Sequence, residues 1–239
     1  MLGAFVLICG LIAVLLVGKE EPRGSGTGPV PDEASPEAPR PAREDYGIIL
    51  HNKVFWVIVF GFFLCLLQTQ MHSSQMNLML IENDLSMQMA ANVVSIYALG
   101  TIIGRIACGL ALDKYSTRIV TVLSMGLPAF GFLLLGSDMN SLPVIAFAMF
   151  LVGLSVGAES DLICYLVARY FRLRIYGTTL GLVHTTTFLS SAAGGLAISL
   201  TLALTDSYGP FLFIAAGAIA LGSMLFLLLP KERDFEKIG

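Results

Sequence analysis

The sequence has little charge. Lys, Arg, Asp and Glu make up only 13% of the 239 residues, whereas hydrophobic residues make up 56%. A soluble domain carries about 25% charged residues, so this chain has too few polar groups to cover a soluble core. Global disorder is excluded because it requires low hydrophobicity and high net charge. The 14 basic and 17 acidic residues leave no basic excess for nucleic acid. The class of protein that fits this composition is a polytopic membrane protein.

The sequence also lacks the usual signs of a cofactor or an enzyme. The four cysteines match no zinc pattern and no disulfide framework. There is no H-E-x-x-H motif and no Ser–His pair at matching depth, so we expect neither a metal nor catalysis. Every lysine lies in a loop or tail, which excludes a retinal Schiff base in the membrane. The four cysteines are Cys9, Cys65, Cys108 and Cys164.

Long hydrophobic runs are what the sequence does contain. A helix needs about 20 mostly apolar residues to cross the hydrocarbon core of a bilayer. Seven segments qualify as candidates, which predicts an all-α, polytopic bundle of transmembrane helices. The segments are 2–17, 54–80, 88–112, 119–135, 143–170, 176–204 and 210–229.

The first segment stands apart from the other six. No basic residue precedes it, which is unlike a signal peptide, so we expect residues 1–17 to be a retained transmembrane helix. Residues 18–53 are rich in Gly, Pro, Ser and charge, and this composition predicts a disordered cytoplasmic linker. Residues 54–229 then form a six-helix bundle, and residues 230–239 form a cytoplasmic tail.

The basic residues predict the orientation of the helices. They gather in the linker, in the turn after the third segment, in the turn after the fifth segment, and in the tail, whereas the alternate loops contain none. Because basic residues stay on the cytoplasmic side, these regions and the C-terminus are expected in the cytoplasm, with the bundle in the cell (inner) membrane.

Apart from residues at the ends of segments and in loops, Arg105 is the one Lys or Arg left over. It lies eight residues before Asp113, which places it about 12 Å from the cytoplasmic end of its helix. Its long side chain could bend to that interface. However, helical side chains lean toward the N-terminus of their helix, which favours the membrane interior. Ionisable residues there usually face a protein interior or an aqueous cavity, so Arg105 is a candidate site residue.

Two acidic residues lie at a similar depth. Glu159 and Asp161 are about 15 and 12 Å from the cytoplasmic end of the fifth segment. They point to nearly opposite faces, so at most one can pair well with Arg105. A buried pair that fixes packing and a role in transport or proton coupling are both open readings. Tyr97 and Thr101 share the face of Arg105, where they line a substrate cavity or bond to neighbouring helices.

The turn after the third segment carries a motif. Gly109, Asp113, Lys114 and Arg118 resemble the G-x-x-x-D-[RK]-x-G-x-[RK] loop of the major facilitator superfamily, with Ser116 in place of the second glycine. The stretches GRIACGLALDK, GAESDLICYLVARYF and YGTTLGL further resemble its monocarboxylate and oxalate/formate branch. The resemblance covers residues 54–229 as a C-terminal six-helix half. It implies that residues 1–17 end an N-terminal half.

The resemblance implies a secondary transporter, or half of one, for a small organic anion such as a monocarboxylate, working by alternating access, for instance as an antiporter. It assigns carboxylate binding to Arg105, four residues before Gly109, and a cytoplasmic gate to the loop residues. Thr101 stands where some relatives have an Asp. The implied partners are the lipid bilayer, the anion and an N-terminal six-helix half. The alternatives are a truncated or split protein that acts only in assembly, and a seven-helix receptor.

Overall fold

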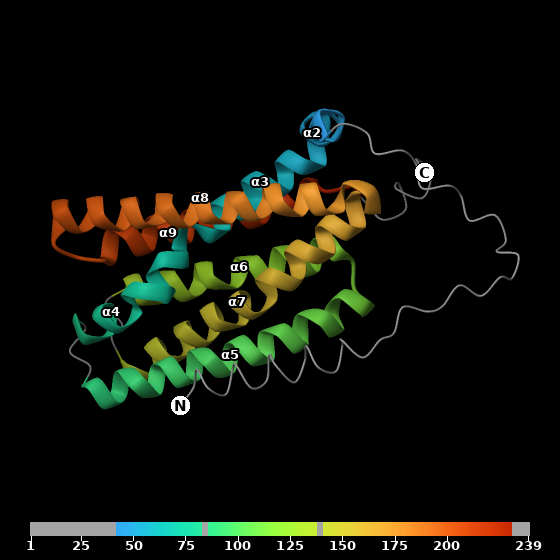
Figure 1. The fold of residues 1–239 in the computed structure, drawn as a ribbon. Coiled ribbons are helices and arrows are strands. Elements are labelled where there is room, and N and C mark those ends of the chain that lie inside the picture. Colours follow the sequence, from blue (N-terminus) through green and yellow to red (C-terminus); the bar gives the residue numbers. More distant parts are fainter. Residues whose placement is uncertain (1–41, 83–85, 138–140, 231–239) are drawn as a thin grey trace, which may run out of the picture. The chain divides into compact units, whose positions relative to one another are not determined.

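The computed structural model describes residues 42–82, 86–137 and 141–230, which belong to one compact unit. Every regular element in these ranges is a helix (Figure 1). The predicted helix 2–17, the linker up to residue 41 and the tail from residue 231 lie outside the described residues. The elements are α2 (Ala42–His51), α3 (Lys53–Cys65), the 3-10 turn η1 (Leu66–Gln68), the π-helical turn η2 (Met71–Gln75), α4 (Met76–Glu82), α5 (Met87–Lys114), α6 (Thr117–Gly136), α7 (Leu142–Tyr170), α8 (Leu173–Thr205), α9 (Gly209–Leu225) and the 3-10 turn η3 (Phe226–Leu228).

The prediction of an all-α bundle of transmembrane helices is confirmed. Five single helices, α5 to α9, are long and apolar enough to cross a membrane. The pair α2 and α3, which is bent by 73°, brings the total to six if it counts as one span. The helix ends lie within a few residues of the ends of the predicted segments.

The ends of the spans follow from short polar or constrained residues. The side chain of Ser86 accepts a hydrogen bond from the backbone N–H of Met89 at 3.3 Å and so caps the start of α5. Pro143 occupies the first turn of α7, where its missing N–H costs nothing. Asp206 ends α8 with a left-handed backbone at φ 50°, a conformation that Asp tolerates better than most residues. This residue turns the chain into α9.

The span predicted over residues 54–80 is broken in its polar half. A 3-10 turn and a π-helical turn separate α3 from α4. Hydroxyl groups there compete for the backbone: Thr69 donates to the carbonyl of Leu66 and Ser73 to that of Thr69, both at 2.7 Å. Such bonds bend helices, and π-helical turns occur often at functional sites.

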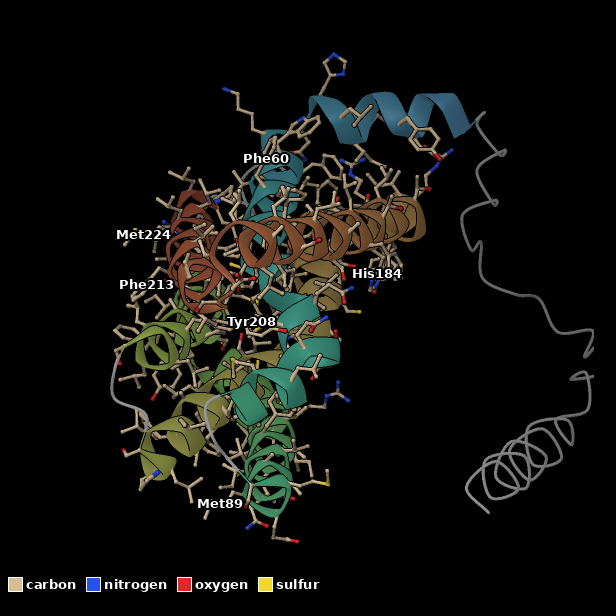
Figure 2. The ribbon with its side chains drawn as sticks, turned by 90° about the vertical axis from the view of Figure 1, so that its left-hand side faces the viewer. Phe60, Met89, His184, Tyr208, Phe213 and Met224 are labelled. Atoms are coloured by element: carbon tan, nitrogen blue, oxygen red, sulfur yellow. The ribbon has the colours of Figure 1, made fainter. Side chains whose placement is uncertain are left out.

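The helices pack in a chain of neighbours. α7 lies between α5 and α6, α6 packs on α9, α9 on α3, and α3 on α8 (Figure 1). Aromatic and aliphatic residues on the outside of the bundle are left for lipid, among them Phe60, Phe213 and Met224 (Figure 2). α5 and α8 are the spans least buried by the other helices. Of the most apolar stretch of each, 22% is buried, compared with 39–44% for α6, α7 and α9.

The prediction of disorder over residues 18–53 is wrong for its last part. Ala42–His51 forms the helix α2, because the run Tyr46–Leu50 is apolar enough to pack. Ile49 is fully buried in the same core as Phe55 and Phe171. The composition of the linker as a whole hid this short apolar run.

Candidate substrate site

The site residues are held on two helices that approach unusually closely. On α5, a methyl group at Gly100 or Gly104 would collide with the backbone of α7. On α7, one at Gly157 would collide with the carbonyl of Thr101 and the amide of Arg105, and one at Gly153 with the carbonyl of Tyr97. Small residues therefore bring Tyr97, Thr101 and Arg105 against α7.

Other glycines of α5 and α8 do not lie at such close contacts. A methyl group at Gly177 or Gly181 of α8 would meet no described atom within 4 Å. The same holds for Gly109 near the end of α5. These three positions face outward in the described part of the chain.

Arg105 reaches across to α7. Its Nη2 donates to the hydroxyl of Ser160 at 3.0 Å, and its Nε donates to the carbonyl of Gly157 at 3.4 Å. The same Nε lies 3.6 Å from Oδ2 of Asp161. The side chains of Arg105 and Asp161 remain 59% and 42% exposed, so the ion pair is open on one side. A second anion can approach the guanidinium from that side.

The contacts of Arg105 lie far from the nearer end of its own helix. Arg105 lies nine residues before the end of α5 and Asp161 nine before the end of α7, which is about 14 Å in each case. Gly157 and Ser160 are further still from that end of α7. The guanidinium therefore does not reach toward the C-terminal end of its own helix.

Glu159 lies in different surroundings from Asp161. It points to another face of α7, within electrostatic reach of Tyr97 on α5 and of Cys65 on α3. Among the described residues it makes no hydrogen bond and no ion pair. Of the two acidic residues, only Asp161 pairs with Arg105.

The outer end of the Arg105 face leads to a second polar group. Thr101 donates to the carbonyl of Tyr97 on its own helix at 3.1 Å, so its hydroxyl is satisfied within α5. The ring of Tyr97 lies 5.8 Å from that of His72, centroid to centroid. His72 is held in turn by its Nδ1, 2.8 Å from Oε1 of the buried Gln68. This places the broken span beside the candidate site residues.

The amides of the broken span also fix it to other helices. Gln70 donates to the hydroxyl of Ser191 on α8 at 2.8 Å, and Tyr208 donates to Oε1 of Gln75 at 3.0 Å. Because an unpaired amide is costly in a membrane, these bonds explain why a polar segment can lie here.

In the described part of the chain no ion pair joins the motif residues of the turn between α5 and α6. Asp113 and Lys114 are exposed at the end of α5. Arg118, at the start of α6, donates to the carbonyl of Leu227 at the end of α9, where the partial negative charge of a helix C-terminus favours a cation. This hydrogen bond ties the loop to the last span.

Two partners of Arg105 were missed by sequence reasoning. Ser160 lies between the two acidic residues, and a lone serine in an apolar helix gives no signal of its own. The carbonyl of Gly157 is accessible only because the glycine lets α5 approach. The one signal in the sequence is the four-residue spacing of Gly153 and Gly157, which is typical of close helix packing but does not identify the partner helix.

Together these features define a membrane-embedded helical bundle with a half-open ion pair between α5 and α7. Residues 58–238 match the family model of the Major Facilitator Superfamily. The chain belongs to this family, and it is a multi-pass integral membrane protein of the secondary transporter class. No curated protein matches the chain.

Proposed function

We propose that the chain carries the anion site of a transporter for small organic anions, with monocarboxylates as the substrate class. The observation that supports this most is Arg105, a guanidinium about 14 Å from the end of α5 along the helix axis, with more than half of its side chain exposed. A carboxylate suits a guanidinium because two parallel N–H···O bonds can form between them.

In this proposal, Asp161 is the resident anion of the empty site. Its oxygen lies 3.6 Å from Nε of Arg105, and the guanidinium keeps Nη groups that can turn to a substrate. Binding of a substrate carboxylate to Arg105 weakens the ion pair between Arg105 and Asp161. The side chain of Asp161 is then free to take a proton or to pair with another group. Glu159 is the second candidate for proton coupling.

Alternating access requires a facing half. Substrate sites of this family lie between two six-helix halves near the bilayer midplane. The weak cover of α5 and α8 favours this side of the bundle as the surface that meets an N-terminal half. Tyr97 and Thr101 then line the cavity. The loop of Gly109, Asp113, Lys114 and Arg118 forms the cytoplasmic gate, with the C-terminus in the cytoplasm of the cell.

The test is uptake of a labelled monocarboxylate into proteoliposomes that contain this chain with its N-terminal half. We expect exchange against internal carboxylate, as in an antiporter, and its loss in Arg105→Gln. Arg169→Gln is the matched control, because Arg169 is an exposed arginine at the end of α7 outside the site. Uptake that survives Arg105→Gln would overturn the assignment.

The alternative is an assembly role without transport. It predicts that the unsubstituted chain and the Arg105→Gln variant bind the N-terminal half equally well. It also predicts that the complex takes up no organic anion. The open ion pair favours the transport proposal, because a purely structural pair would be expected to be closed.

A further inference from the structure

The start of the bundle carries a helix that does not cross the membrane. The axis of α2 is bent by 73° from the helical run that begins with α3. Since α3 enters the bundle as a span, a helix at this angle lies near the plane of the membrane. Figure 2 shows α2 lying across the end of α3.

The bend is held by specific hydrogen bonds. Asn52 ends α2 with an extended backbone, and its side chain accepts from the backbone N–H of Val54 at 2.9 Å to cap α3. Trp56, in the first turn of α3, donates from Nε1 to the carbonyl of Leu50 at 2.9 Å. The indole therefore satisfies a carbonyl at the end of α2 and links the two helices.

The outward surface of α2 is apolar. Ile49 is fully buried against the bundle, whereas Tyr46, Ile48 and Leu50 are 44%, 53% and 44% exposed. Trp56 is 42% exposed and stacks on Phe60, with ring centroids 5.6 Å apart. Tryptophan and tyrosine gather where the hydrocarbon meets the headgroups, because their rings are apolar and their N–H or O–H is polar.

Basic side chains surround this surface. Lys53 is exposed at the first residue of α3, and Arg172 is exposed in the turn between α7 and α8. Phe55 and Phe171, with ring centroids 6.5 Å apart, hold the start of α3 beside this turn. Among the side chains of α2 that the structure describes, Asp45 is the one carboxylate, and it is partly buried. The exposed charge of the described side chains beside the apolar surface is therefore positive.

We propose that α2, Trp56, Lys53 and Arg172 form a docking surface for anionic lipid headgroups. The apolar side chains enter the boundary of the hydrocarbon while the two cations meet the headgroup charge, as in other interfacial helices. This inference does not depend on the transported substrate. It requires only that the bundle lies in a bilayer.

The single tryptophan of the chain provides the test. The full chain is placed in phosphatidylcholine bilayers, and brominated phosphatidylglycerol or brominated phosphatidylcholine is added to quench Trp56. We expect stronger quenching from bromine near the start of the acyl chain than from bromine near its end. We also expect a relative association constant that favours phosphatidylglycerol several-fold.

Single substitutions assign the selectivity. A basic residue near an anionic surface contributes about fivefold in association, so Lys53→Gln or Arg172→Gln should lower the preference for phosphatidylglycerol about fivefold. Lys114→Gln is the matched control, because Lys114 is an exposed lysine at the end of α5. It should leave the preference unchanged.

Three results would overturn the proposal. Equal quenching by the two lipids in the unsubstituted chain would show that the surface does not prefer anionic lipid. This test does not depend on whether any variant folds. A loss in Lys114→Gln equal to that in Lys53→Gln shows general charge attraction. Absence of quenching by either lipid shows that protein covers α2.

Discussion

At the scale of single residues, the contrast between Asp161 and Glu159 carries the account of the site. The two side chains are separated by one residue on α7, yet only Asp161 lies within 3.6 Å of Arg105. In the proposed site Asp161 therefore competes directly with an incoming carboxylate, whereas Glu159 lies within electrostatic reach of Tyr97 and Cys65.

Asp161→Asn should strengthen anion binding. A partly exposed ion pair contributes about 0.2–1 kcal/mol, so its removal should lower the apparent dissociation constant of a monocarboxylate about two- to fivefold. The measurement is equilibrium binding to the purified complex at constant pH and salt.

Glu159→Gln is the control for this prediction, because it also removes a negative charge from α7. It should not tighten binding to the same extent. If Asp161→Asn instead weakens binding as much as Arg105→Gln does, Asp161 positions the guanidinium and does not compete with the substrate.

At the scale of elements, the contact between α5 and α7 determines the geometry of the site. Gly157→Ala should be destabilising, because the new methyl group meets the carbonyl of Thr101, a backbone atom that cannot move without moving α5. Overpacking of this kind costs about 1–3 kcal/mol and should lower the melting temperature by several degrees. Thermal unfolding in detergent measures the effect.

The matched substitution is Gly181→Ala on α8, where no described atom lies within 4 Å of the added group. Alanine favours a helix over glycine, so the melting temperature should stay the same or rise slightly. Equal losses in the two variants would show that the close crossing of α5 and α7 is not the cause.

The elements themselves were largely predictable from the sequence. Long apolar runs fixed the spans because only a continuous helix satisfies the backbone in lipid. The break in the helix near Thr69 and Ser73 was not predicted. It depends on hydrogen bonds from the hydroxyl groups of these residues to backbone carbonyls. The helix at Ala42–His51 was missed because a short apolar run gains its stability from burial of Ile49, which composition does not reveal.

At the scale of the whole molecule, the distribution of basic residues predicts which ends of the helices face the cytoplasm. Tyr115, in the turn between α5 and α6, is 66% exposed, and Ser207, between α8 and α9, is exposed at the opposite end (Figure 1). Cysteines introduced at these two positions should lie on opposite sides of the membrane.

A membrane-impermeant maleimide measures this. Ser207→Cys should react in intact cells, whereas Tyr115→Cys should react only after permeabilisation. The unsubstituted chain gives the background from its own cysteines, of which Cys65 and Cys108 are buried. The opposite pattern would place the C-terminus outside the cell.

The candidate site was only partly predictable. Arg105 stood out because a charge in an apolar segment is costly, and the similar depth of Asp161 made it one of two possible partners. The choice of Asp161 over Glu159 depends on the rotation of α7 against α5, which the glycines at 153 and 157 determine only in three dimensions. The roles of these residues in transport stay predictions.

The most direct test of the central claim is the affinity of a monocarboxylate for the complex with Arg105, Lys or Gln at this position. A charge-assisted pair of hydrogen bonds contributes about 1.5–3 kcal/mol, so Arg105→Gln should weaken binding about tenfold to a hundredfold. Arg105→Lys should recover part of the loss, and Arg169→Gln should bind normally. Unchanged affinity in Arg105→Gln would contradict the account.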